Sequence, residues 1–295
     1  MRAGPIAIIG ASGQLARALV RIAGTRGVTA VAAGRPVADI GSADSMSAYM
    51  SAHQPGLVIN AAAYTAVDKA ESEPGAAWRV NRDGPTHLAR LCAGAGVPLI
   101  HISTDYVFDG RKRSPYVEDD ATAPLGVYGQ SKAAGEDAVR AALARHIILR
   151  TAWVYGREGQ NFLRTMLRLG AEREVVRVVA DQHGTPTYAD HLAGAVLDIA
   201  AAVRDRDDRG PWGTYHLTAK GATTWHGFSA EIFRQAHQAG RKTPRLEAIT
   251  TAEYPAPAPR PQYSVLDTAK VYDTFAVALP DWQHGVAECM TRLIQ

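Results

Sequence analysis

Tyr128 and Lys132 are two residues whose types and spacing could support acid–base chemistry. They open an expected helix after a loop that contains Pro124 and Gly126, and a spacing of four places both side chains on one helix face. A free phenol has a pKa near ~10, whereas a neighbouring ammonium group favours its ionised form and brings it closer to neutral pH. The pair could therefore transfer a proton to a carbonyl oxygen during a reduction. Such pairs also occur by chance, so the interpretation depends on the surrounding motifs.

Thr104 is the natural third member of this group. It belongs to the run Ser103-Thr104-Asp105-Tyr106-Val107-Phe108-Asp109-Gly110, which ends an expected buried strand. Ligands of open α/β sheets bind beyond the carboxyl ends of the strands, so a hydroxyl here could hydrogen-bond a carbonyl oxygen that is being reduced. A plain Ser/Thr turn at the strand end is the alternative.

A glycine-containing loop near the N-terminus suggests what would supply the hydride. Gly10-Ala11-Ser12-Gly13-Gln14-Leu15-Ala16 lies where the first expected strand turns into the first helix. Glycines there let backbone N–H groups approach a pyrophosphate at the helix N-terminus. The spacing differs from G-x-G-x-x-G, and alone it is also compatible with a plain tight turn. Together with the Tyr–Lys pair it predicts a nicotinamide dinucleotide site that includes Gly10, Ser12, Gly13, Gln14 and Leu15.

The end of the second expected strand indicates which dinucleotide is bound. A carboxylate there suits the ribose hydroxyls of NAD, whereas an arginine accommodates the additional phosphate of NADP. The chain has Ala33-Gly34-Arg35 at this place and no carboxylate before Asp39. We therefore expect NADPH, with NADH as the alternative, and we place Arg35, Asp39 and Ile40 at the cofactor. A solvated loop arginine is the other interpretation of Arg35.

Five short apolar runs alternate with helix-like segments, and these elements must position the candidate residues. The apolar runs lie at 5–9, 28–33, 57–63, 97–103 and 147–151. Near-continuous apolar strands that alternate with helices indicate parallel strands buried on both faces. The expected fold class is α/β, a Rossmann-like doubly wound parallel sheet with a smaller C-terminal substrate-binding lobe. We assign 1–155 to the cofactor domain, to which 188–218 return, and 156–187 with 219–295 to the lobe.

The bulk composition excludes several other classes of protein. A formal charge of +3 over 295 residues, without a basic run, gives no case for nucleic acid. The two cysteines, Cys92 and Cys289, are too few for a disulfide framework. The first apolar run is too short for a signal peptide or a membrane anchor, so we expect a cytoplasmic protein with no membrane partner.

The motifs resemble the dTDP-4-dehydrorhamnose reductase family of the extended short-chain dehydrogenase/reductase superfamily. The similarity runs nearly from end to end, and the most specific segment is Asn60-Ala61-Ala62-Ala63-Tyr64-Thr65-Ala66-Val67-Asp68-Lys69-Ala70-Glu71. Other matching segments are the glycine loop, Ser103–Gly110, Tyr128–Lys132, Arg150–Gly156, Asp181–Thr187, Thr224–His226, Arg260–Leu266 and Leu279–Trp282.

By this resemblance the chain would reduce the C4 carbonyl of dTDP-6-deoxy-L-lyxo-4-hexulose (dTDP-4-dehydrorhamnose), a dTDP-4-keto-6-deoxyhexose, to give dTDP-L-rhamnose. Tyr128 would donate the proton, Lys132 would hold the ribose and lower the pKa of Tyr128, and Thr104 would orient the oxygen. We place a further set of residues along the cofactor, namely Ala61, Ala62, Ala63 and Thr65. The residues assigned to the sugar nucleotide are Asp105, Phe108, Trp153, Asn161 and Arg260, with Arg260 at the diphosphate.

The chain departs from the family pattern at a metal site. Some members bind magnesium through glutamates at a dimer interface, and we find Ala18, His191 and Arg292 at the corresponding places. We therefore expect no such metal and no dimer of that kind, and a chain that is monomeric or a weak homodimer.

Related activities give the alternative interpretations. A sister reductase could act on another dTDP-4-keto-deoxysugar with the same motifs. A 4,6-dehydratase is disfavoured because Tyr106 occupies the position of its usual extra glutamate, and a C4 epimerase would retain its nicotinamide. A non-catalytic regulatory subunit, like that of methionine adenosyltransferase, shares the fold, but the intact Thr104, Tyr128 and Lys132 favour catalysis.

Overall fold

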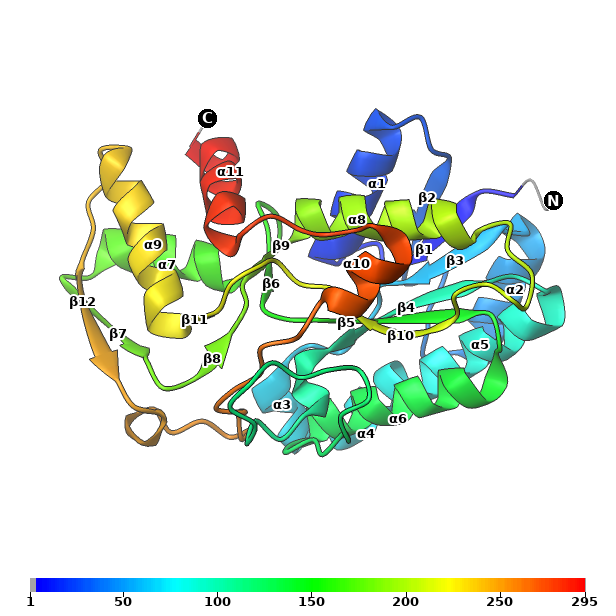
Figure 1. The fold of residues 1–295 in the computed structure, drawn as a ribbon, viewed down its shortest axis with the longest axis horizontal. Coiled ribbons are helices and arrows are strands. Elements are labelled where there is room, and N and C mark those ends of the chain that lie inside the picture. Colours follow the sequence, from blue (N-terminus) through cyan, green and yellow to red (C-terminus); the bar gives the residue numbers. More distant parts are fainter. Residues whose placement is uncertain (1–3, 295) are drawn as a thin grey trace.

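A six-stranded parallel sheet forms the centre of the larger part of the molecule (Figure 1). The computed structural model describes residues 4–294. The sheet has the order β10-β5-β4-β3-β1-β2. Its strands are β1 (Ile6–Ile9), β2 (Ala30–Ala33), β3 (Leu57–Asn60), β4 (Leu99–Thr104), β5 (His146–Thr151) and β10 (Gly213–His216). The chain reverses direction across the sheet between β1 and β3, which is where doubly wound sheets bind their ligands. The predicted fold class is confirmed.

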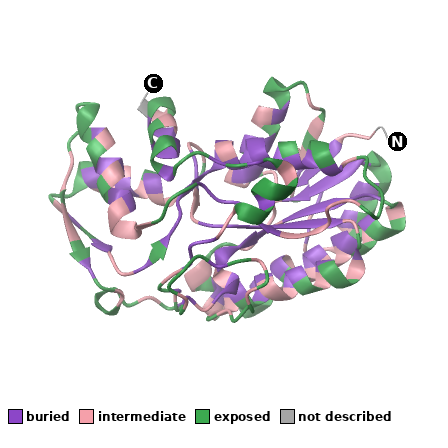
Figure 2. Cartoon of the chain, viewed as in Figure 1, coloured by how far each residue is buried: buried purple, intermediate pink, exposed green. Residues whose placement is uncertain are grey.

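Helices cover both faces of this sheet. On one face α1 (Gln14–Thr25) packs against α8 (Ala189–Val203), and on the other lie α2 (Ala43–His53), α5 (Gly84–Ala95) and α6 (Val127–Ala142). Successive side chains of a strand point to opposite faces, so Ile8 joins the first core cluster and Ile9 the second. Figure 2 shows the strands as the most continuously buried part of the molecule.

The helical segment between β3 and β4 is not one continuous helix. The chain forms α3 (Val67–Ser72), α4 (Pro74–Trp78) and a π-helical turn at Arg79–Asp83 before α5 begins. At this turn Asn81 accepts a hydrogen bond from the backbone of Tyr64 at 2.8 Å and donates one to Ser131 at 3.0 Å. The turn thus joins the segment after β3 to the helix that carries Tyr128, a use typical of π-bulges near functional sites.

A smaller set of elements lies beside the sheet, at the left of Figure 1. Its helices are α7 (Phe162–Glu172), α9 (Trp225–Gln238) and α11 (Trp282–Ile294), whereas α10 (Ala269–Phe275), which precedes α11, packs against β10 of the large sheet. Its strands form three two-stranded sheets, β7 (Val175–Val179) with β12 (Arg245–Ile249), β6 (Val154–Tyr155) with β9 (Thr187–Tyr188), and β8 (His183–Gly184) with β11 (Thr223–Thr224). These elements share a core around Phe228 and Trp282. The exact domain boundaries stay a prediction.

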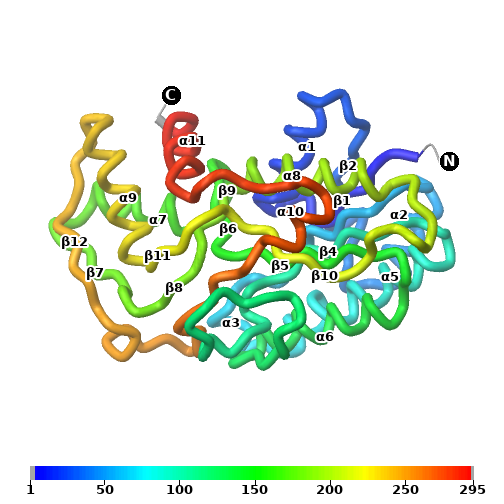
Figure 3. The backbone as a smooth tube through the Cα atoms, in the orientation of Figure 1, coloured from blue at the N-terminus to red at the C-terminus, as the bar shows by residue number. Residues whose placement is uncertain are grey.

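The proline-rich segment after β12 returns from this lobe to the larger part. In Figure 3 it is the orange stretch that runs from β12 toward α3. Its Arg260 forms an ion pair with Asp68 of α3 at 2.8 Å. No helix within residues 4–294 is long and apolar enough to cross a membrane.

Candidate active site

The three predicted catalytic residues come together at the carboxyl edge of the sheet. Thr104 ends β4, and Tyr128 and Lys132 lie on the first turns of α6. All three side chains are buried. Gly129 permits the close approach, because a Cβ at this position would lie 2.2 Å from the carbonyl oxygen of Tyr106. The carboxylate of Glu71 accepts a hydrogen bond from the Val127 N–H at 2.8 Å and so satisfies the start of the helix.

Tyr128 is in its protonated form at neutral pH. Burial raises the pKa of Tyr128 to about 12, while a hydrogen bond with Thr104 lowers it and the charge of Asp105 raises it. The hydroxyl of Thr104 also donates to Asp105 Oδ1 at 3.1 Å. A protonated phenol held by a neighbouring hydroxyl is the form that a carbonyl reductase needs before the reaction.

Lys132 provides a buried ammonium group behind Tyr128. Its Nζ donates to the carbonyl oxygen of Ile102 at 2.7 Å and lies 3.5 Å from His101 Nε2. Burial lowers the pKa of Lys132 to about 8, and the charge of Glu136 raises it. The expectation that Lys132 lowers the pKa of Tyr128 stays a prediction, since burial dominates that pKa in the structure.

A buried ion pair lies next to the catalytic residues, and the sequence motifs did not predict it. The carboxylate of Glu136 in α6 accepts a hydrogen bond from Arg150 Nη2 of β5 at 2.7 Å and another from the Ser103 hydroxyl of β4 at 2.5 Å. Three elements that carry or flank the catalytic residues are thereby tied together. The available signal was Arg150 itself, because an arginine inside an apolar strand requires a buried counter-charge.

The glycine loop lies at the carboxyl ends of β1 and β3. Gly10 has a φ of +107°, and a Cβ there would lie 2.7 Å from the Ala62 nitrogen. Only glycine therefore allows the loop to lie against 61–63. Gln14 donates to the Val154 carbonyl oxygen at 2.8 Å, which links α1 to the lobe. Ser12 is exposed at the turn, whereas Leu15 is buried in the core beneath it.

The residues predicted to select the cofactor differ in exposure. Arg35 follows β2, is exposed and forms no hydrogen bond or ion pair with other residues of the described chain. Asp39 accepts a hydrogen bond from the Gly41 N–H at 3.0 Å, and Ile40 is buried in the second core cluster. Thr65 is exposed. Arg35 is the member of this set with a side chain free to reach a phosphate.

Two predicted substrate residues lie at the same sheet edge as Thr104. Asp105 directly follows Thr104, and Trp153 lies two residues after Thr151, the residue of β5 that pairs with Thr104. Trp153 has a φ of +46°, and its ring stacks on Trp225 with centroids 3.6 Å apart. Gly184 makes room for this ring, because a Cβ there would lie 2.4 Å from it. Burial raises the pKa of Asp105 to about 6, and hydrogen bonds with Ser264 and Thr104 lower it. Its contact with Trp153 places Trp225 beside the predicted substrate residues.

The other three predicted substrate residues contact other parts of the protein. Phe108 is fully buried and stacks on Tyr116 with centroids 4.2 Å apart, and it also lines a narrow pocket together with Tyr128. Asn161 caps α7 and lies 3.4 Å from Gln14, beside the glycine loop rather than Tyr128. Arg260 is paired with Asp68 and would have to leave it to meet a diphosphate.

The comparisons with known proteins agree with this geometry. The profile of the RmlD substrate binding domain family matches residues 4–295. The dTDP-4-dehydrorhamnose reductase of Sinorhizobium fredii is 42% identical over 289 residues, which cover 98% of this chain and 97% of that protein. The enzyme of the same name from Escherichia coli K12 is 43% identical over 257 residues, which cover 86% and 85%.

Solved structures agree as well. A dTDP-4-dehydrorhamnose reductase from Bacillus anthracis in complex with NADP superposes with a TM-score of 0.91 at 32% identity, covering 98% of this chain and 99% of that one. A Clostridium acetobutylicum dTDP-4-dehydrorhamnose reductase gives a TM-score of 0.92 at 36% identity, covering 99% and 100%. The predicted NAD(P)H-dependent oxidoreductase is thereby confirmed, and the chain belongs to the dTDP-4-dehydrorhamnose reductase family.

Proposed function

We propose that this chain reduces the C4 carbonyl of dTDP-4-dehydrorhamnose to give dTDP-L-rhamnose, with NADPH as the preferred hydride donor. The observation that carries the proposal is the buried group of Thr104, Tyr128 and Lys132 at the sheet edge beside the glycine loop. Relatives that carry this activity in their names match nearly the whole chain. The regulatory-subunit alternative would leave this acid–base group without a use.

The residues present fit a dinucleotide. Gly10 allows the turn between β1 and α1 to lie close against Ala62, and the N-terminus of α1 has no side-chain cap that would compete with a pyrophosphate for its N–H groups. Arg35 is exposed and unpaired among residues 4–294, as a partner of the additional NADP phosphate should be. Lys132 offers a buried ammonium group for the ribose hydroxyls. When bound, the cofactor supplies the hydride.

The proton would come from Tyr128. As the C4 carbon accepts the hydride, the C4 oxygen gains negative charge and takes the hydroxyl proton of Tyr128, so a C–H bond and an O–H bond form together. Thr104 would hydrogen-bond the same oxygen and fix its position. Lys132, whose pKa is lowered to about 8 by burial, would stabilise the tyrosinate that remains. Solvent then returns the proton to Tyr128.

The sugar nucleotide would lie between the sheet edge and the lobe. The Asp105 carboxylate could accept a hydrogen bond from a sugar hydroxyl, and the indole ring of Trp153 could contact the sugar face. Arg260 would exchange Asp68 for the diphosphate, because a doubly charged group attracts the guanidinium more strongly than an exposed carboxylate does. Phe108 and Asn161 would act on the substrate indirectly, because each holds neighbouring residues of the site in place.

The test is NADPH oxidation by the purified protein with dTDP-4-dehydrorhamnose made in situ from dTDP-glucose. We expect rapid oxidation and dTDP-L-rhamnose as the product, with a higher kcat/KM for NADPH than for NADH. Cofactor binding without oxidation would overturn the proposal and direct attention to a sister 4-keto-deoxysugar or to a partner enzyme. Size-exclusion chromatography would test the expected monomer or weak homodimer, and the cytoplasmic location stays a prediction.

A further inference from the structure

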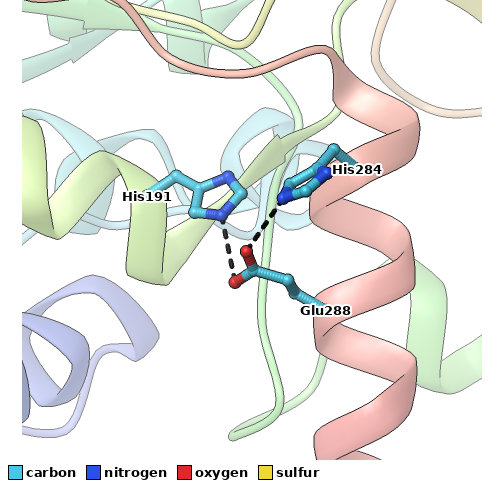
Figure 4. Close-up of side chains that lie close together, drawn as sticks. All are labelled: His191, His284 and Glu288. Carbon is cyan, nitrogen blue, oxygen red and sulfur yellow. Dashed lines mark hydrogen bonds and ion pairs between the residues drawn. The ribbon is translucent and has the colours of Figure 1, made fainter.

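Two histidines and a glutamate from different parts of the chain meet away from the catalytic group. His191 lies near the start of α8, and His284 and Glu288 lie on α11 (Figure 4). His191 Nε2 is 3.1 Å from Glu288 Oε2, and His284 Nε2 is 3.1 Å from Glu288 Oε1. The ligand atoms of the three residues all lie within 4.8 Å of one another.

These distances suit a small tetrahedral metal ion. Bonds of ~2.0–2.1 Å in a tetrahedron require donor atoms about 3.3 Å apart. Each imidazole nitrogen lies 3.1 Å from its nearer oxygen of Glu288, and all three ligand atoms lie within 4.8 Å of one another, so small side-chain rotations would close the set around an ion. Two imidazoles with one carboxylate favour zinc and its first-row neighbours over magnesium or calcium, which prefer oxygen ligands. We propose that His191, His284 and Glu288 form a zinc-binding site, with a fourth position left to water.

Local packing brings the three ligands together. His284 and Glu288 are four residues apart and share one face of α11. Gly285 lies between them, and a Cβ there would lie 2.9 Å from both the Tyr155 hydroxyl and the Tyr188 side chain. Its missing side chain therefore allows α11 to lie close to β6 and β9, and so beside His191, which follows β9 at the start of α8. The ring of His191 packs edge-on against Tyr188 with centroids 5.1 Å apart, which holds it in place.

The surroundings leave the three ligands accessible to an ion. The side chains of His191, His284 and Glu288 are 15%, 61% and 39% exposed. A cavity of about 490 Å³ between α1, α8 and residues 275–280 is also lined by His191, and it lies away from Tyr128. Asp190 lines the same cavity, but its carboxylate forms an ion pair with Arg21 at 2.8 Å. The candidate ligands are therefore two imidazoles and the Glu288 carboxylate, whose two oxygens contact only these imidazoles among the described ion pairs.

A bound ion would join two parts of the fold. His191 belongs to a helix of the sheet's first core cluster, and α11 belongs to the core of the lobe. Zinc would therefore cross-link the cofactor-binding part and the lobe. Because the ion would bind the folded chain and not the unfolded one, it would stabilise the folded protein. This proposal is independent of the reductase activity and departs from the expectation of no metal, which rested on missing glutamates at 18, 191 and 292.

The test is isothermal titration of the metal-free full-length protein with zinc chloride. We expect one zinc per chain, with binding weakened by more than about 100-fold in both His284→Ala and Glu288→Gln, because loss of a ligand should exceed the 10–100-fold effect of outer partners. His237→Ala, an exposed histidine near the end of α9, is the matched control and should bind like the wild type. Magnesium should give no such binding.

Thermal unfolding gives a second readout. Zinc should raise the Tm of the wild type and of His237→Ala, and a chelator should reverse the increase, whereas His284→Ala should show no shift. Circular dichroism would verify that each variant is folded. Absence of saturable zinc binding, or equal binding by the double variant His284→Ala/Glu288→Gln, would overturn the site. In that case the three residues form an ion-pair cluster only.

Discussion

Replacing Lys132 by methionine should reveal a cost in stability at the cofactor site. Lys132 is 1% exposed, and burial lowers the pKa of its ammonium group from 10.5 to about 8. Methionine has a similar length and no charge, so it removes the desolvation penalty and leaves the space filled. The variant should lose affinity for NADPH and gain stability in the absence of cofactor.

The magnitude follows from the two pKa values. At ~1.36 kcal/mol for each pH unit, the difference between 10.5 and about 8 amounts to about 3 kcal/mol at pH 7. The lost hydrogen bond to the Ile102 carbonyl subtracts about 1 kcal/mol, which leaves a gain of about 2 kcal/mol. The pKa is lowered in the folded state, so between pH 8 and 10.5 the unfolded chain binds more protons and the wild type gains stability as the pH rises. The advantage of the variant should therefore shrink by about 2–3 kcal/mol between pH 7 and 10.

The assay is urea unfolding followed by circular dichroism, without cofactor, at pH 7 and pH 10. Lys220→Met is the control, because Lys220 is exposed and its replacement should change stability equally at both pH values. A Lys132→Met variant whose stability relative to wild type is the same at pH 7 and pH 10 would refute the reasoning.

Three further substitutions test the proposed roles. Tyr128→Phe should lower kcat by about 10²–10⁴-fold because the proton donor is lost, with an unchanged Kd for NADPH by fluorescence titration. Tyr49→Phe, which removes a buried hydroxyl far from the site, is its control, and a near-wild-type kcat for Tyr128→Phe would exclude Tyr128 as the acid. Arg35→Ala should raise the KM for NADPH at least about tenfold and leave that for NADH nearly unchanged; equal effects would remove Arg35 from the phosphate site. Gly184→Ala should displace the Trp153 ring, with which its Cβ would collide at 2.4 Å, and raise the KM for the sugar nucleotide but not for NADPH.

Much of the fold could be predicted from local patterns. The run Leu57–Asn60 is apolar up to its last residue and is buried throughout as β3, because a parallel strand covered on both faces needs apolar side chains in succession. The spacing of Tyr128 and Lys132 places both on the first turns of α6, since helix geometry alone determines which residues share a face. Gly10 is likewise a local requirement of a tight turn with positive φ.

The tertiary structure decided which distant side chains meet. The partner of Arg150 is Glu136 on another element, Phe108 packs inward on Tyr116, and Arg260 pairs with Asp68 across the lobe boundary. No periodic pattern in the sequence predicts these contacts, because each depends on how distant elements pack against one another in the folded chain. The same holds for His191, whose neighbours on α11 come close only through the missing side chain of Gly285. Local spacing thus determined the elements and the catalytic pair, and long-range packing determined the charges that surround them.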